Sequence, residues 1–194
     1  MKPVLAMVAG VSAMLISQPV FAHTFGAEGA SFYQGFIHPL SGPDHLLAML
    51  AVGVWAVQTG GRARWLIPAA FLALLALGGG MGMLGWPLPQ VELGIAGSVV
   101  VFGLLIASAA KMPLWLSMSV GGLFALFHGH AHGVEMPQAA MPWLYVSGFL
   151  LTTAMLHGLG MLTGLVHRYA VPARVLRLGG VGRAAAGIWL FAGL

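Results

Sequence analysis

Six apolar runs, each bounded by proline, glycine or charged residues, dominate the sequence. They cover residues 43–59, 62–84, 90–110, 113–132, 141–166 and 173–193. Each run is close to the length of about 20 residues that an α-helix needs to cross the hydrocarbon core of a bilayer. Only 6% of the 194 residues are charged, which is too few to solvate the outside of a water-soluble domain. The sequence therefore predicts an all-α integral membrane protein, a bundle of six transmembrane helices.

The amino-terminal segment, residues 1–22, has the pattern of a cleavable signal peptide. A basic residue, Lys2, precedes a short apolar stretch, and small or compact residues stand at the two positions that a signal peptidase reads before the end of Ala22. We expect cleavage there, which leaves residues 23–194 as one six-helix domain; an uncleaved first helix is the alternative. After cleavage, His23 would be the new amino terminus, and its amine and imidazole could chelate a divalent cation together.

The basic residues indicate the orientation of the bundle. If the mature chain starts outside, the first, third and fifth connections are cytoplasmic. These three connections contain all the loop arginines and lysines: Arg62, Arg64, Lys111, Arg168 and Arg174. The outer connections contain none, so the positive-inside rule predicts that both mature termini are periplasmic. Because the basic residues are scattered singly, the net charge of +4 reports topology, with the lipid bilayer as partner, and excludes a nucleic-acid site.

The first polar cluster lies at residues 36–45, just before the first predicted transmembrane helix. Two prolines and a glycine break the backbone there, so we expect an irregular lead from Phe32 into that helix. Broken backbone inside a membrane protein is tolerated where it lines a cavity or is buried in protein. His38, Asp44 and His45 supply two imidazoles and a carboxylate, a set that suits a borderline divalent metal. The alternative for Asp44 is a capping box with Ser41.

The second polar cluster lies at the outer end of the fourth predicted helix. At 100° per residue, His128, His132 and Glu135 share one helical face, while His130 points away. Such a density of ligand residues predicts metal capture. A pH-sensing histidine cluster is the alternative, because imidazole titrates near neutrality.

Two further polar residues are candidates for an ion path. His157 lies near the predicted midplane of the fifth helix, below the two clusters, and Glu92 lies near the outer start of the third. An ordinary interfacial acid is the alternative for Glu92. We therefore predict a relay, with the outer cluster and His23 above a site formed by Asp44, His45 and His128, and with His157 below it.

Two motifs resemble those of the HupE/UreJ family of nickel permeases. They are His38-Pro39-x-x-Gly42-x-Asp44-His45 and Phe127-His128-Gly129-x-Ala131-His132-Gly133-x-Glu135. The resemblance implies that the metal-handling residues are His38, Asp44, His45, His128, His132 and Glu135. The residues themselves add four secondary candidates, His23, Glu92, His130 and His157. The resemblance also implies a secondary transporter for Ni²⁺ uptake, with Co²⁺ as a second cargo, across the bacterial inner membrane.

Further expectations follow from the resemblance and from motifs that are absent. The family is associated with hydrogenase or urease maturation, so we expect a transporter, not an enzyme, with no permanently bound cofactor. The sequence contains no Gly-x-x-x-x-Gly-Lys-Ser/Thr loop for nucleotide binding. The alternatives are a haem-binding electron-transfer subunit, with His128 and His157 as axial ligands, and a membrane metal sensor. The choice between nickel and cobalt, the energy coupling and assembly into a homo-oligomer stay open.

Overall fold

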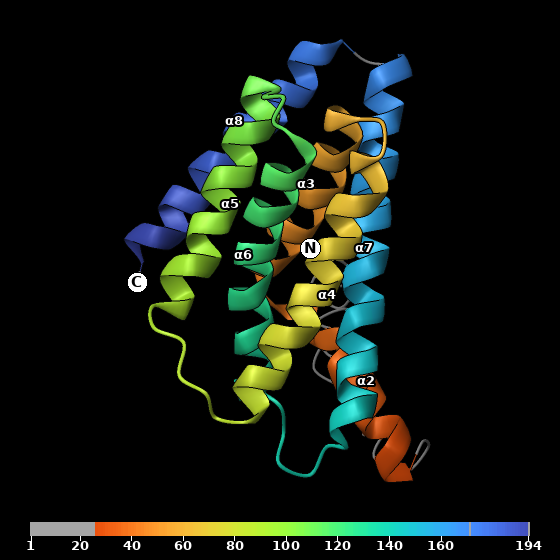
Figure 1. Cartoon of the computed structure of the whole chain (residues 1–194), viewed down its shortest axis with the longest axis vertical. Coiled ribbons are helices and arrows are strands. Elements are labelled where there is room, and N and C mark those ends of the chain that lie inside the picture. The colour runs from red at the N-terminus through yellow and green to blue at the C-terminus, as the bar shows by residue number, and fades with distance from the viewer. Residues whose placement is uncertain (1–25, 171, 194) are drawn as a thin grey trace, which may run out of the picture.

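The computed structural model describes residues 26–170 and 172–193, and these residues form seven α-helices. The helices are α2 (Gly26–Ser41), α3 (Pro43–Thr59), α4 (Ala63–Met83), α5 (Val91–Ser108), α6 (Leu114–Val134), α7 (Pro142–Ala170) and α8 (Ala173–Ala192). Figure 1 shows them packed side by side as one bundle. The helices α3 to α8 match the six predicted runs to within four residues at each end. The predicted signal peptide and His23 lie outside the described residues, and so both stay predictions.

The lead into the first predicted span is helical, so the expectation of an irregular segment from Phe32 is wrong. α2 continues to Ser41 with Pro39 inside its last turn. A proline has no N–H, so the helix loses the hydrogen bond to the carbonyl four residues earlier. The loss of one bond matters little where the helix ends two residues later. The predicted break is present at Gly42, where α2 and α3 meet with a bend of 83°. The two helices therefore form one bent unit.

The described helices are long and apolar enough for a membrane protein. Four of them meet the length and hydropathy of a membrane span, namely α4, α5, α7 and α8, and the bent α2–α3 pair makes a fifth. α6 is as long as α4, at 21 residues, but it contains His128, His130 and His132, which lower its mean hydropathy. The architecture is therefore that of an all-α membrane protein, and a count of six spans stays a prediction.

Glycines bring α4 and α6 into backbone contact. A Cβ at Gly129 would collide with the carbonyl oxygen of Leu75, and a Cβ at Gly133 would collide with that of Gly79. Small residues at a helix interface allow this close approach, which gives van der Waals contact in a bilayer where no hydrophobic force drives helices together. Because Gly129 and Gly133 alternate with the histidines of α6, the contact fixes the helix that carries them.

Three more helix pairs follow the same principle. On α7, Gly148 meets the backbone of α2 at Phe32, and Gly160 meets the backbone of α3 at Leu50. On α8, Gly180 meets the backbone of α5 at Gly103. The bundle thus contains three backbone-locked units: α2–α3–α7, α4–α6 and α5–α8.

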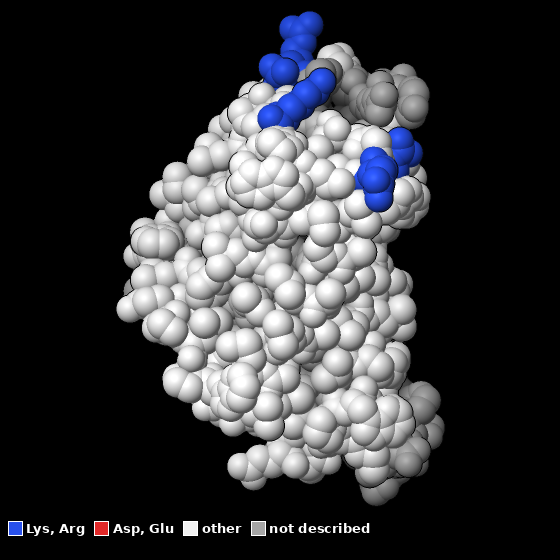
Figure 2. Space-filling model, in the orientation of Figure 1, with Lys and Arg blue, Asp and Glu red and all other residues white. Residues whose placement is uncertain are grey.

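Among the described residues, Arg62, Arg64, Lys111, Arg174 and Arg177 lie at or near the α3–α4, α5–α6 and α7–α8 connections, while Arg183 lies in the middle of α8. Figure 2 shows basic side chains at the end that carries these connections in Figure 1, and none is visible elsewhere on the face shown. This is the arrangement that the positive-inside pattern predicts for a cytoplasmic end. The α2–α3 break and the last turn of α6 lie toward the opposite half of the molecule.

Candidate metal centre

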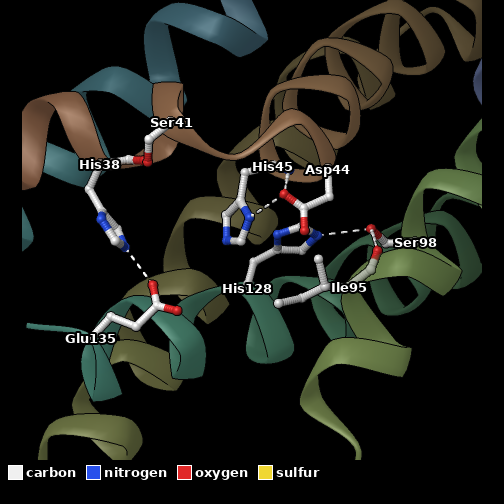
Figure 3. A network of polar contacts seen from close by, with 8 residues as sticks. All are labelled: His38, Ser41, Asp44, His45, Ile95, Ser98, His128 and Glu135. Atoms are coloured by element: carbon white, nitrogen blue, oxygen red, sulfur yellow. Dashed lines mark hydrogen bonds and ion pairs between the residues drawn. The ribbon is translucent and has the colours of Figure 1, made fainter. Parts of the chain in front are cut away.

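One cavity brings most of the predicted metal residues together. It has a volume of about 220 Å³ and opens between the α2–α3 break, the start of α5 and the end of α6. Its wall includes His38, Asp44, His45, Glu92, His132 and Glu135. The chain has only four acidic residues, and three of them line this cavity. Figure 3 shows side chains from α2, α3 and α6 directed into the same space.

The break at Gly42 places Asp44 and His45 in the first turn of α3. Gly42 is the N-cap of α3, with an extended backbone and no side-chain cap. The alternative of a capping box with Ser41 is wrong, because Ser41 is the last residue of α2 and its hydroxyl donates to the carbonyl of His38 at 2.6 Å. Asp44 Oδ1 instead accepts from the backbone N–H of His45 at 2.7 Å and lies 3.1 Å from His45 Nδ1. The carboxylate thus orients the adjacent imidazole.

His38 and Glu135 meet across the mouth of the cavity. His38 Nε2 lies 2.7 Å from Glu135 Oε2, and Figure 3 shows the two side chains pointing toward each other. The two side chains are 27% and 53% exposed, so solvent reaches both. This contact joins the last turn of α2 to the residue that follows α6.

Four imidazoles lie in a chain of ring contacts at the cavity. The ring centroids of His38 and His132 are 4.8 Å apart, those of His132 and His45 are 4.6 Å apart, and those of His45 and His128 are 4.5 Å apart. On its other side, the His132 ring stacks on Phe149 at 5.0 Å. The two histidine motifs therefore form one cluster in space, as the sequence predicts.

Ser98 of α5 fixes the orientation of His128. The Ser98 hydroxyl donates its one proton to the carbonyl of Ile95 at 2.6 Å. Its oxygen lies 2.8 Å from His128 Nε2 and must therefore accept, so that Nε2 carries the ring proton and Nδ1 keeps a free lone pair. Sequence reasoning missed Ser98; the available signal was a hydroxyl within the apolar run of α5.

Several buried ring nitrogens in this cluster have no hydrogen-bond partner. They are His45 Nε2, His128 Nδ1, His132 Nδ1 and His132 Nε2. Buried polar atoms are nearly always satisfied, so a concentration of unsatisfied imidazole nitrogens points to a ligand. Within the described residues, no group of three or more His, Asp or Glu side chains is arranged to hold an ion as it stands.

A second cavity adjoins the first. It has a volume of about 210 Å³ and is bounded by Gln34, Ile37, Pro137 and Tyr145, together with His38, Ser41 and Glu135. The last three of these residues also line the first cavity. The contact between His38 and Glu135 therefore stands at the boundary between the two spaces.

The secondary candidates lie in different places. Glu92 lines the first cavity. His130 is directed away from it, with Nε2 2.8 Å from the carbonyl oxygen of Trp86, as its helical position predicts. His157 is buried deeper, against Phe71, with ring centroids 5.1 Å apart. The aromatic residues Phe71 and Phe149 also contact the histidines, and nothing in their sequence context distinguishes them from ordinary core residues.

Comparisons with known proteins identify the family of this chain. Residues 11–190 match the family described as HupE / UreJ protein. A curated relative, Protein HupE of Rhizobium leguminosarum bv. viciae, is 45% identical over 147 residues, which cover 75% of this chain and 77% of the relative. No solved structure matches the chain. The family match spans all of the candidate metal residues and reaches into α8, and the chain therefore belongs to the HupE/UreJ family.

Proposed function

We propose that this protein is a permease that carries Ni²⁺, with Co²⁺ as a second cargo, across the bacterial inner membrane. The observation that carries the proposal is the gathering of three of the four acidic residues and three histidines around one cavity. Ionisable residues in a membrane bundle are costly and mark ion paths. The association of the family with nickel and cobalt uptake for hydrogenase or urease supports this cargo and this destination.

The donor chemistry favours a borderline divalent cation. Imidazole nitrogens suit nickel and cobalt, while carboxylates add charge neutralisation. Asp44 and His45 offer one of each from the first turn of α3, and His132 offers a ring without any hydrogen-bond partner. A soft cation would favour methionine or cysteine sulfur, but the chain has no cysteine and no methionine lines the cavity. We therefore assign the cation to the cavity between α3 and α6.

The helix ends around the cavity add to its electrostatic character. α2 and α6 both end at this cavity, and the carbonyl ends of helices carry partial negative charge. α3 and α5 begin there, and each has an acidic residue, Asp44 or Glu92, in its first turn to offset the positive amide end. A broken helix that presents such ends to a cavity is a common form of ion site in transporters.

In this proposal, the cation reaches the cavity through the contact between His38 and Glu135. It first occupies the second cavity, beside Gln34 and Tyr145. It then replaces the hydrogen bond that joins the side chains of His38 and Glu135. Both side chains become ligands as they separate. Asp44, His45 and His132 then take over the cation, with the side chains rotating to do so. Binding must stay weak enough for release, which favours successive partial ligand sets over one closed cage.

The test is accumulation of radioactive nickel in cells that lack other nickel uptake systems. Expression of the intact chain should produce accumulation, and Asp44→Asn and His132→Ala should each remove most of it. Leu123→Ala is the matched control, because Leu123 lies on the exposed face of α6. Full accumulation in both site variants would rule out the proposed path. Nickel binding by the intact protein without accumulation would favour the metal sensor instead.

A further inference from the structure

One face of α7 carries a buried stripe that leads away from the candidate metal centre. Its members are Tyr145, Phe149, Thr153 and His157, at every fourth position, and their exposed fractions are between 0% and 2%. Residues four apart in a helix lie on the same face, one above another. At a rise of 1.5 Å per residue, the stripe is about 18 Å long.

The Tyr145 end of the stripe contacts two histidines that line the first of the two cavities, which is the outer cavity of this path. The Tyr145 ring lies 6.0 Å from that of His38, and Phe149 stacks on His132 with an interplanar angle of 12°. These aromatic rings form the wall along which the imidazole cluster lies. The same face of α7 therefore continues from the outer cavity into the interior.

The other end of the stripe, at Thr153 and His157, has polar atoms without a hydrogen-bond partner. Thr153 Oγ1 and both ring nitrogens of His157 are buried and make no hydrogen bond. A hydroxyl and an imidazole left unsatisfied in a bundle are costly, unless a ligand satisfies them for part of the time. The outer cavity does not explain these atoms, because neither residue lines it.

Phe71 connects this deeper pair to the outer cluster. Its ring centroid lies 5.1 Å from that of His157 and 6.2 Å from that of His128. Among the described residues, it is the one aromatic side chain in ring contact with both histidines. A cation that leaves His128 would reach His157 by passing this ring.

We propose that His157 and Thr153 form a second, deeper binding station for the transported divalent cation, beyond Phe71. This inference rests on the proposed transport function and extends its path into the lower half of the bundle. The station has one imidazole and one hydroxyl and contains no carboxylate, so it holds the cation less tightly than the outer cavity. Weak binding suits a station from which the ion must move on.

The test uses the fact that the chain has no cysteine. In the full-length purified protein, His157→Cys introduces a single thiol, and a thiolate that binds Co²⁺ gives a charge-transfer absorption band in the near ultraviolet. Addition of Co²⁺ alone should produce this band in His157→Cys and in Thr153→Cys, which differs little in size from the native side chain. Leu159→Cys is the matched control, because Leu159 lies on the exposed face of the same helix and should give no band.

The possible results separate this inference from the proposed function. A band in either buried variant, without one in the control, supports the deeper station. Co²⁺ binding measured by equilibrium dialysis, with no band in either buried variant, overturns the station while the outer site stands. Absence of Co²⁺ and Ni²⁺ binding to the intact protein overturns both.

A transport measurement adds a readout that a purely structural role would not change in the same way. His157→Leu should lower nickel accumulation by about tenfold or more, while Ni²⁺ binding to the outer cavity stays within about twofold of the intact protein. His157→Cys should restore part of the accumulation, since it restores a ligand atom. Equal accumulation in His157→Leu and the intact protein would contradict the proposal.

Discussion

His38 and Glu135 stand 97 positions apart in the sequence, yet their side chains meet at 2.7 Å. The contact joins the end of α2 to the end of α6, and it lies where the first and second cavities adjoin. Each residue is thus positioned by a helix from a different backbone-locked unit. In the proposed path, a cation would pass between the cavities at this pair.

Removal of the Glu135 charge should impair uptake. Glu135→Gln keeps the size of the side chain and a hydrogen bond to His38, but it removes the negative charge that would attract a cation. We expect nickel accumulation to fall by about tenfold or more, as is usual when a group at a metal site is lost. Glu135→Asp, which keeps the charge, should retain more uptake than Glu135→Gln. The opposite order would show that the hydrogen bond, and not the charge, is what matters.

Loss of the Ser98 hydroxyl should weaken metal binding through His128. Ser98→Ala removes the acceptor of the Nε2 proton, so the ring is free to turn or to change tautomer. Loss of such an orienting partner costs about tenfold in metal affinity, which isothermal titration with Ni²⁺ would measure. Ser119→Ala is the control, because that hydroxyl bonds only to a carbonyl of its own helix. Equal affinities for the two variants would argue against an orienting role.

Addition of one methyl group between α4 and α6 should destabilise the bundle. Gly133→Ala places a Cβ against the backbone of Gly79, and overpacking of this kind costs about 2 kcal/mol in the free energy of unfolding. Gly80→Ala is the matched control, because no atom lies within 4 Å of its added Cβ. Thermal unfolding in detergent should show a lower midpoint for Gly133→Ala than for Gly80→Ala. Identical midpoints would mean that the helices separate without cost.

Nickel binding should weaken as the pH falls through the range in which imidazole takes up a proton. The cation and the proton compete for the same ring lone pairs, so ligation is favoured at higher pH and is lost at lower pH. Equilibrium binding of Ni²⁺ to the purified protein between about pH 7.5 and about pH 5.5 would measure this effect. Binding that is constant over this range would exclude ligation by any imidazole that takes up a proton within it.

Much of the helical layout could be predicted from the sequence, because apolar runs bounded by Pro, Gly and charge are a strong local signal. The broken backbone at Gly42 and the shared face of His128 and His132 also follow from local rules. The helical form of α2 could not be predicted in this way, because a proline in the last turn of a helix is a poor indicator of an irregular backbone. The role of Ser98 depends on α5 packing against α6, and no spacing within one helix could reveal that contact.

The three backbone-locked units have a consequence for how the bundle can change shape. Asp44 belongs to α2–α3–α7, Glu135 follows α6 of the α4–α6 unit, and Glu92 belongs to α5–α8, so each unit brings one carboxylate to the cavity. Within a unit, sliding would force backbone atoms together. The seams between units lack that restraint, and a displacement along any of them alters the triangle of negative charges. The geometry of the cavity is therefore a measure of how the three units stand relative to one another.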